Sequence, residues 1–370
     1  MINKSITHIT TVHPRYDTRV FVKECKSIKR NGLNVNLIVA DGLGNEIKEG
    51  INIIDLGKPR SRLIRMVFYS RKAYRMAKNI NCDIYHFHDP ELLPLGIKLT
   101  KRGNKVVYDV HEDVPKQILT KPYLNKFLAK LISKIFEKYE NRCSSKFSAI
   151  ITATPFIRER FLKFNKTTTE VQNFPFLDEF PTVSENSKTK NSVCYIGSIT
   201  EVRGIRNMIK SLEFTNDIKL NLGGAFNSIQ LRSEVSKLLG WEKVNELGFL
   251  DRIQVKSVLD ESIAGLVVLK PTINYLDSIP VKMFEYMASG IPVIASDFPY
   301  WKDLIEDVGC AIFVNPEDPK EIGLAMQKLV DDPMEAKLMG AKGREAILRK
   351  FNWDNEESKL MGAYLKLIEG

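Results

Sequence analysis

The hydrophobic residues of this chain fall into short runs, and between the runs they recur every three or four positions. Runs rich in Val, Ile and Leu predict buried strands, whereas spacings of three and four predict amphipathic helices. In the first half we expect strands at residues 6–12, 34–40, 51–56, 83–88, 105–111 and 148–154. In the second half we expect them at residues 192–198, 218–224, 244–250, 264–270, 291–296 and 310–315. Strands that alternate with helices are typical of parallel-sheet α/β proteins.

A polar segment without apolar periodicity separates the two series, at residues 181–191 (PTVSENSKTKN), and predicts a linker. A chain of 370 residues is also long for one hydrophobic core. We therefore predict two doubly wound α/β domains, at residues 1–185 and 186–350. A ligand would bind in the cleft between them, at the carboxyl ends of the strands. One more helix is expected at residues 352–368, with no strand after it.

The composition is typical of a soluble globular protein, with 44% hydrophobic and 27% charged residues. No run approaches the roughly 20 apolar residues of a membrane span, and the N-terminus has no apolar signal core. We therefore expect a cytoplasmic protein. The 5 cysteines are far apart and form no C-x-x-C pair, which indicates neither a zinc site nor disulfides. The net charge of +10 would suit nucleic acid, anionic lipid or a phosphorylated substrate.

The most informative segment is residues 277–296 (DSIPVKMFEYMASGIPVIAS). Pro280 is expected to open a helix, where its missing N–H costs little. Backbone N–H groups near Ser278 and Lys282 then form an anion site at the helix N-terminus. Glu285, one turn further along, can accept hydrogen bonds from sugar hydroxyls. The alternative is an ordinary capped helix with a surface glutamate.

The pattern P-x-K-x-F-E-Y-M-A-x-G-x-P-V-I-A-S in this segment resembles the donor-binding motif of the retaining glycosyltransferases of family 4, which have the GT-B fold of two Rossmann-like domains. The resemblance implies that Glu285 binds the ribose hydroxyls and that Asp277, where the family usually has glutamate, contacts the donor sugar. Residues 195–204 (YIGSITEVRG) resemble the family's diphosphate-binding segment. Arg203 takes the position of its lysine, and Ser198 takes that of its arginine, so one cation is missing.

Shorter matches lie between these two segments. Residues 221–225 (NLGGA), which include Gly224, resemble the strand end that precedes the next helix of the family. Residues 244–250 (VNELGFL), which include Gly248, resemble the segment that lines the nucleotide base. The final residues, 351–370, resemble the helix that crosses back to the first domain.

The first domain carries the acceptor side in this fold, with polar residues expected where its strands end. The segments concerned are 12–24 (VHPRYDTRVFVKE), 86–91 (HFHDPE) and 109–113 (DVHED). Their candidate cleft residues are His13, Arg15, Asp17, Arg19, His88 and Glu112. His111 matches the family histidine near the transferred sugar. A core histidine is the alternative.

We expect no metal and no cofactor apart from the nucleotide-sugar co-substrate. The sequence has no D-x-D motif and no His, Cys and carboxylate cluster with convincing ligand spacing. Arg203, Lys282 and the helix N-terminus would instead neutralise the leaving diphosphate.

Residues 122–142 (PYLNKFLAKLISKIFEKYENR) combine an apolar helical face with a row of lysines. A second basic stretch, at residues 60–78, also contains apolar side chains. Basic amphipathic segments can lie in an anionic membrane interface. The alternative is a surface helix with its apolar face in the core. Since relatives often act on lipid-linked acceptors, the resemblance favours peripheral association with the inner face of the cell membrane.

We therefore predict a metal-independent glycosyltransferase with His111, Arg203 and Asp277 as its catalytic residues. It would move a sugar from a nucleotide-sugar donor, taken as a UDP-sugar, to a glycan or lipid-linked acceptor with retention of configuration. The resemblance suggests bacterial surface polysaccharide or O-antigen synthesis. The alternatives are a nucleotide-sugar epimerase or hydrolase, a catalytically inactive binding subunit, and a basic nucleic-acid-binding protein. No nucleic-acid module is recognisable, so we expect no such partner.

Overall fold

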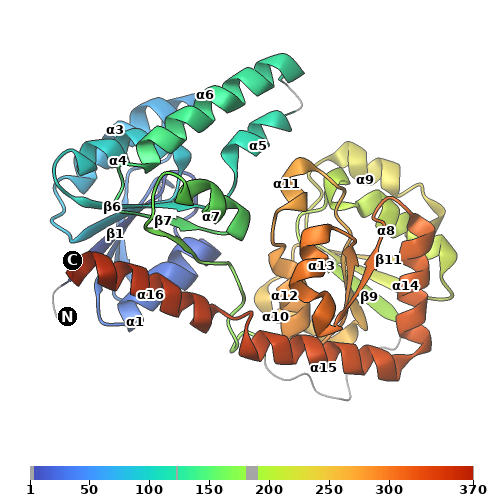
Figure 1. Cartoon of the computed structure of the whole chain (residues 1–370). Helices are drawn as coiled ribbons and strands as arrows, with labels where there is room; N and C mark the ends of the chain where they lie inside the picture. Colours follow the sequence, from blue (N-terminus) through green and yellow to red (C-terminus); the bar gives the residue numbers. More distant parts are fainter. Residues whose placement is uncertain (1–3, 122–123, 181–190, 370) are drawn as a thin grey trace. The chain divides into compact units, whose positions relative to one another are not determined.

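The computed structural model describes residues 4–121, 124–180 and 191–369, and the chain divides into two compact units (Figure 1). One unit comprises Met1–Asn173 and Trp353–Gly370, and the other comprises Phe174–Asn352. The boundary thus lies before the predicted linker, of which all but Asn191 falls outside the described residues. The physical reason is Phe174, whose ring packs 4.7 Å from that of Phe284 in the second unit.

The first unit is built on an eight-stranded sheet with the order β3-β4-β2-β1-β5-β6-β7-β8. The strands are β1 Ser5–Ile9, β2 Asn34–Val39, β3 Glu46–Lys48, β4 Ile51–Asp55, β5 Ile84–Phe87, β6 Lys105–Val110, β7 Ala149–Thr152 and β8 Thr168–Glu170. All neighbouring pairs are parallel except β3 and β4. The six strands expected in this half are present. Strands β3 and β8 were not predicted, because three residues of mixed polarity carry no periodic signal.

Helices cover both faces of this sheet, with α3 and α4 on one side and α1 and α16 on the other (Figure 1). The helical segments are η1 Thr18–Cys25, α1 Lys26–Arg30, α2 Arg62–Ile64, η2 Arg65–Tyr69, α3 Ser70–Ala77, η3 Pro90–Leu92, α4 Leu93–Thr100, α5 Val114–Leu119, α6 Lys126–Ser144, α7 Pro155–Leu162 and α16 Trp353–Glu369. The last helix belongs to this unit, because Trp353 donates a 2.8 Å hydrogen bond to Ser27 Oγ and the Tyr364 hydroxyl lies 2.5 Å from His86 Nδ1.

The second unit contains a six-stranded parallel sheet with the order β11-β10-β9-β12-β13-β14. Its strands are β9 Ser192–Ile196, β10 Lys219–Gly223, β11 Val244–Gly248, β12 Ala264–Val267, β13 Val293–Ser296 and β14 Ala311–Val314. Each coincides with a strand expected from the sequence. The prediction of two doubly wound α/β sheets is therefore confirmed.

Helices also flank the second sheet on both faces, and two hydrophobic clusters hold them there. One cluster includes Tyr195, Ile205 and Met326, and the other includes Phe284 and Trp301. The helical segments are η4 Glu201–Arg203, α8 Ile205–Ser211, η5 Leu212–Phe214, α9 Ile229–Val235, η6 Leu239–Lys243, α10 Arg252–Glu261, α11 Ile273–Leu276, α12 Val281–Ala288, α13 Pro299–Ile305, η7 Glu306–Val308, α14 Pro319–Asp331 and α15 Pro333–Arg349.

Helix α6 turns its apolar face outward. The side chains that α6 buries are small or polar and include Ala129, Ser133 and Glu140. In contrast, Phe127 is 79% exposed and Ile135 is 60% exposed. The structure therefore excludes the alternative in which the apolar face of this helix packs in the core. Among the described helices, none is both long and apolar enough to cross a lipid bilayer.

Candidate functional site

In the second unit, three strand ends meet through glycines. The N–H of Gly197 donates to the carbonyl of Gly223 over 2.9 Å, and the N–H of Gly224 donates to the carbonyl of Gly248 over 2.6 Å. Gly224 has φ +129°, and a Cβ there would lie 1.9 Å from the carbonyl oxygen of Gly197. Only glycine, which has no Cβ, allows the two backbone segments to come this close. These glycines form a backbone surface without side chains, here called the glycine floor, at the carboxyl edge of the sheet, where α/β folds bind ligands.

Two cationic side chains lie against this floor. A Cβ built on Gly197 would lie 3.3 Å from Lys282 Nζ and 3.5 Å from Arg203 Nη1, so both cations flank the end of β9. Lys282 Nζ also lies 4.8 Å from the centroid of the Tyr195 ring. Arg203 Nη1 lies 3.4 Å from the carbonyl oxygen of Ser198, to which it donates. The two predicted diphosphate-binding cations therefore converge, although they are 79 positions apart in the sequence.

The electrostatic environment of Lys282 is unusual for a lysine. Burial lowers its pKa, the neighbouring charge of Arg203 lowers it further and Glu285 opposes both, leaving a pKa of about 8. The guanidinium of Arg203 remains protonated throughout this range. Because a bound anion would favour the charged form of Lys282, the pair is suited to a ligand with two negative charges.

The remaining predicted donor residues lie around the start of α12. Pro280 is its N-cap residue, and among the described residues no side chain caps this helix. The carbonyl of Ser278 accepts from Trp301 Nε1 over 2.8 Å, and its hydroxyl donates to the carbonyl of Tyr275 over 3.1 Å. Ser278 therefore positions the chain that enters α12.

Asp277 precedes the start of α12 in the sequence, and Glu285 follows it. Asp277 is the residue after α11, a one-turn helix that the sequence pattern did not indicate. Glu285 lies within α12, and both side chains are half-buried. The predicted donor group thus comes from the loop after β9 and from the α11–α12 segment. Ser198, by contrast, is exposed.

In the first unit, all 5 histidines of the chain form one continuous group. The ring centroids of His8 and His86 are 4.5 Å apart, and those of His86 and His88 are 4.6 Å apart. His111 lies 5.3 Å from His88 and 4.9 Å from His13. They come from β1, β5 and the segments that follow β1, β5 and β6, so the group occupies the carboxyl edge of this sheet.

Asp109 organises the accessible side of this group. It accepts hydrogen bonds from Arg19 Nε and Nη2 over 3.1 and 2.9 Å, and its Oδ2 lies 2.7 Å from His111 Nε2 and 3.1 Å from His88 Nδ1. Burial alone would raise the pKa of Asp109, but Arg19 and His111 hold it well below its usual range. The resulting carboxylate fixes the imidazole of His111, whose side chain is 17% exposed.

Three of the predicted cleft residues have structural roles instead. The guanidinium of buried Arg15 binds Asp41 over 2.7 and 2.6 Å and Glu46 over 2.5 Å. Arg19 is equally buried against Asp109. Asp17 accepts from the N–H groups of Arg19 and Val20, over 2.9 Å each, and so caps η1.

The other predicted cleft residues differ in how far they are exposed to solvent. His88 is buried, so it also does not line an open surface. His13 and Glu112 remain accessible, the former with 26% of its side chain exposed. Of the candidate acceptor residues, the structure therefore leaves His13, His111 and Glu112 at the surface of the first unit.

Some residues of this edge were missed by the sequence interpretation. Buried Asp89 accepts from Thr11 N over 2.5 Å and from Val12 N over 3.2 Å, and so holds the loop after β1. Glu24 is completely buried beside the histidines. All three residues lie in the polar segments 12–24, 86–91 and 109–113 that follow strands and could have been found there.

Two protein-family models match this chain. Residues 178–346 match the model described as "Glycosyl transferases group 1", and residues 18–172 match "Glycosyltransferase Family 4". Each match falls almost entirely within one of the two structural units. Together the two models span most of the sequence, including both predicted donor segments and the histidine group apart from His8 and His13.

Similar proteins give a consistent result. The "MMP alpha-(1->4)-mannosyltransferase" of Mycolicibacterium hassiacum is 23% identical over 88% of this chain and 81% of its own length. The sucrose-phosphate synthase structure from Thermosynechococcus elongatus has a TM-score of 0.80 at 17% identity and covers 99% of both chains. HepE from Anabaena, solved in complex with UDP-glucose, has a TM-score of 0.74 at 14% identity, with 98% of this chain and 99% of its own covered.

Proposed function

Because this chain belongs to the GT-B glycosyltransferases of the family 4 type, we propose that it transfers a sugar from a nucleotide-sugar donor, with retention of configuration, to a glycan or lipid-linked acceptor. The observation that carries the donor assignment is the convergence of Arg203 and Lys282 on the glycine floor. The complex of HepE with UDP-glucose supports a UDP-sugar as the first donor to test.

In this proposal the donor diphosphate lies over Gly197, between the two cations. Arg203 binds phosphate oxygens through two N–H groups, and Lys282 contributes a compact second charge. Their positive charge stabilises the leaving nucleoside diphosphate as the sugar–oxygen bond breaks, so this diphosphate needs no metal ion. Glu285 binds the ribose hydroxyls, and Asp277 contacts the donor sugar.

The acceptor hydroxyl attacks the anomeric carbon from the face that the diphosphate leaves. An oxygen of the leaving phosphate accepts the proton of the acceptor hydroxyl. In this mechanism the carboxylates of Asp277 and Glu285 do not act as nucleophiles. His111, held by Asp109, is the residue of the first unit that we assign to the reacting region. Its fixed orientation favours a hydrogen bond to a sugar hydroxyl.

Nucleotide binding tests the donor assignment, with pH as the variable. We expect UDP affinity to fall as the pH rises through about 8, because the free protein then loses the proton of Lys282. The fall can reach about tenfold per pH unit if only the charged form binds. In Lys282→Arg the charge persists, so the affinity should be nearly constant with pH. Calorimetry with UDP and GDP, in buffer without divalent cations, measures both proteins between about pH 7 and about pH 9.

Either of two results would contradict the donor assignment. One is an absence of binding to every nucleoside diphosphate at millimolar concentration. The other is the same pH dependence in the wild type and in Lys282→Arg, which would show that another group titrates.

We further propose that the acceptor is reached at an anionic membrane surface. The exposed apolar residues of α6 are Phe127, Leu128, Leu131, Ile132, Ile135 and Tyr139. Lys126, Lys130, Lys134 and Lys138 are exposed on the same helix. Apolar side chains beside a row of cations fit the boundary between acyl chains and anionic headgroups, where each cation contributes about 1 kcal/mol. A lipid-linked glycan of bacterial surface polysaccharide, such as O-antigen, is the acceptor class that we propose.

Vesicle binding tests this surface. We expect the wild type to sediment with vesicles containing phosphatidylglycerol. The double variant Phe127→Asp/Ile135→Asp should bind at least about tenfold more weakly, because it loses two exposed apolar side chains that the lipid would otherwise cover. Ile229→Asp is the matched control, since Ile229 is 90% exposed on α9 of the other unit. Equal binding of the double variant and the wild type, or no binding of the wild type, would exclude this surface.

A further inference from the structure

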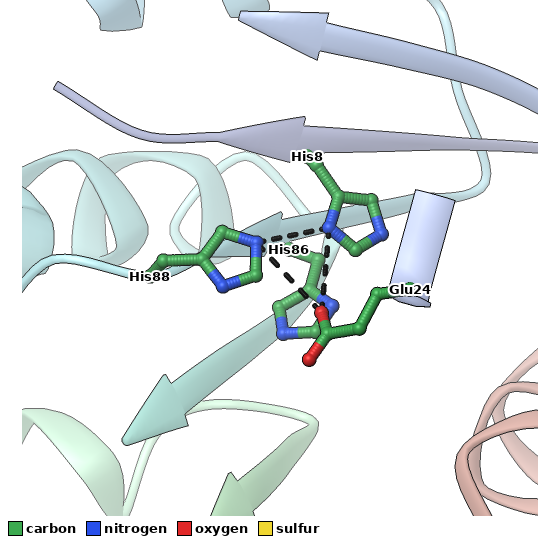
Figure 2. Close-up of side chains that lie close together, drawn as sticks. All are labelled: His8, Glu24, His86 and His88. Carbon is green, nitrogen blue, oxygen red and sulfur yellow. Dashed lines mark hydrogen bonds and ion pairs between the residues drawn. The ribbon is translucent and has the colours of Figure 1, made fainter. Parts of the chain in front are cut away.

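Three histidines and a glutamate meet in the interior of the first unit. His8, Glu24 and His86 have no exposed surface and His88 is 3% exposed. One potential ligand atom from each of the four side chains lies within 4.8 Å of the others. Figure 2 shows the rings of His8 and His88 and the carboxylate of Glu24 facing one another, with His86 beside them. All four residues lie in the first unit, whereas the proposed donor residues lie in the second.

Several atoms of this group have no hydrogen-bond partner among the described residues. They are both carboxylate oxygens of Glu24 and Nε2 of His86. Arg19 Nε lies 3.1 Å from Glu24 Oε1, but its N–H donates to Asp109 Oδ2. Buried polar atoms are nearly always hydrogen-bonded, so three such atoms in one place need an explanation. A bound cation would satisfy Nε2 of His86 and Oε2 of Glu24, while Oε1 of Glu24 faces Arg19.

The distances between the facing atoms fit a small divalent cation. His8 Nδ1 lies 2.9 Å from His88 Nε2 and 3.7 Å from Glu24 Oε2, and His88 Nε2 lies 4.0 Å from the same oxygen. In a tetrahedral zinc site, ligand distances of about 2.0–2.1 Å place neighbouring ligand atoms roughly 3.4 Å apart. Shifts of a few tenths of an ångström therefore bring these three atoms into coordination geometry.

The imidazole nitrogens that point away from the centre of the group have hydrogen-bond partners, as is usual for histidines that bind a metal. Nδ1 of His88 lies 3.1 Å from Asp109 Oδ2, which directs the Nε2 lone pair toward Glu24. The Tyr364 hydroxyl lies 2.5 Å from His86 Nδ1 and 3.4 Å from His8 Nε2. Outer partners of this kind fix the tautomer and orientation of metal-binding histidines.

We propose that His8, Glu24, His86 and His88 bind one zinc ion. The ion is structural, because the group is buried and far in sequence from the donor motifs. It joins β1, β5 and η1 beneath the accessible histidines. Since access is closed in the folded unit, the ion is taken up during folding. This inference does not rest on the proposed sugar transfer, and it leaves the metal-free binding of the diphosphate unchanged.

Metal analysis of the intact chain tests the proposal. The protein is expressed in zinc-supplemented medium, passed over a weak chelator, and analysed by mass spectrometry for bound metal. We expect about one zinc ion per chain in the wild type, and loss of that zinc in Glu24→Gln, which keeps the side-chain shape but removes the charged ligand. His13→Gln is the matched control, because it removes a histidine of the same group outside the four ligands, and it should retain its zinc.

A second measurement tests the zinc site without relying on the Glu24→Gln variant alone. Refolding the wild type with Co²⁺ should give the intense visible absorption of a tetrahedral nitrogen and oxygen site. Tyr364→Phe, which removes only an outer hydroxyl, should weaken metal binding about 10- to 100-fold. A wild type that holds no zinc, and shows no such absorption or rise in Tm after refolding with metal, overturns the proposal. Equal zinc content in the wild type and Glu24→Gln also overturns it, and none of these results depends on nucleotide binding.

Discussion

Replacing Arg203 with alanine is expected to slow sugar transfer by about 10²- to 10³-fold, the usual effect of removing a charge-stabilising donor from a transition state. Arg203 lies at the end of η4 beside Gly197, and its partner cation Lys282 has a pKa of only about 8. Without Arg203, the departing diphosphate would keep only Lys282 as a cation, although the pKa of Lys282 would rise because the charge of Arg203 no longer lowers it. The loss should therefore appear mainly in kcat, because charge on the leaving group develops in the transition state.

Release of nucleoside diphosphate, measured together with formation of the acceptor product, checks this expectation. Arg203→Lys should keep most of the activity, since the related family motif has lysine at this position. Arg206→Ala is the matched control, because Arg206 is paired with Glu201 and Glu234 and has no contact with the glycine floor. Transfer at the wild-type rate by Arg203→Ala would remove this residue from the reaction.

Replacing Asp109 with asparagine is expected to destabilise the first unit by about 3–5 kcal/mol. Asp109 is fully buried and binds Arg19 through both carboxylate oxygens while it also contacts His88 and His111. The substitution would put a neutral amide in place of the main partner of the buried Arg19 guanidinium, which would keep only the contact with Glu24 at 3.1 Å. Breaking one side of a buried ion pair is costly, because the remaining charge has lost its water and its partner.

Urea denaturation followed by circular dichroism gives the free energy of unfolding. Asp83→Asn is the matched control, since Asp83 also forms an ion pair, with Lys4 at 2.9 Å, but both side chains are partly exposed. Exposed pairs contribute at most about 1 kcal/mol, so this variant should be close to the wild type. Equal effects of the two substitutions would show that the Arg19–Asp109 pair is not a major determinant of stability.

The architecture could be predicted because twelve strands carry apolar runs long enough to recognise. The exceptions, β3 and β8, are held by their neighbours in the sheet and not by local pattern. Helix α6 shows another limit of prediction from the sequence. Its periodicity identified an apolar face, but periodicity does not say whether another element covers that face. Only the packing of Ala129 and Ser133 shows that the opposite side of the helix faces inward.

The convergence of Arg203 and Lys282 could be expected because each lies in a continuous segment that resembles a family motif; their assignment to the donor diphosphate stays a prediction. Fewer site residues of the first unit could be predicted, because the type of a residue does not indicate which residue it will contact. Arg15 pairs with Asp41 and Glu46, which lie 26 and 31 positions away. His8 meets His86 only because β1 and β5 are neighbours in the sheet. Contacts of this kind depend on strand order, which a single sequence does not state.

The close approach of Gly224 to Gly197 has a consequence for engineering. Any side chain at position 224 would strike the carbonyl oxygen of Gly197, so this floor cannot be varied in a mutant library without loss of the fold. A search for variants with a new sugar preference should therefore keep both glycines and randomise exposed Ile273 and the half-buried positions 274–277. Under the proposed donor assignment, diversity placed in α11 and in the residue that follows it would change the contacts to the sugar, while the glycines beneath the diphosphate stay constant.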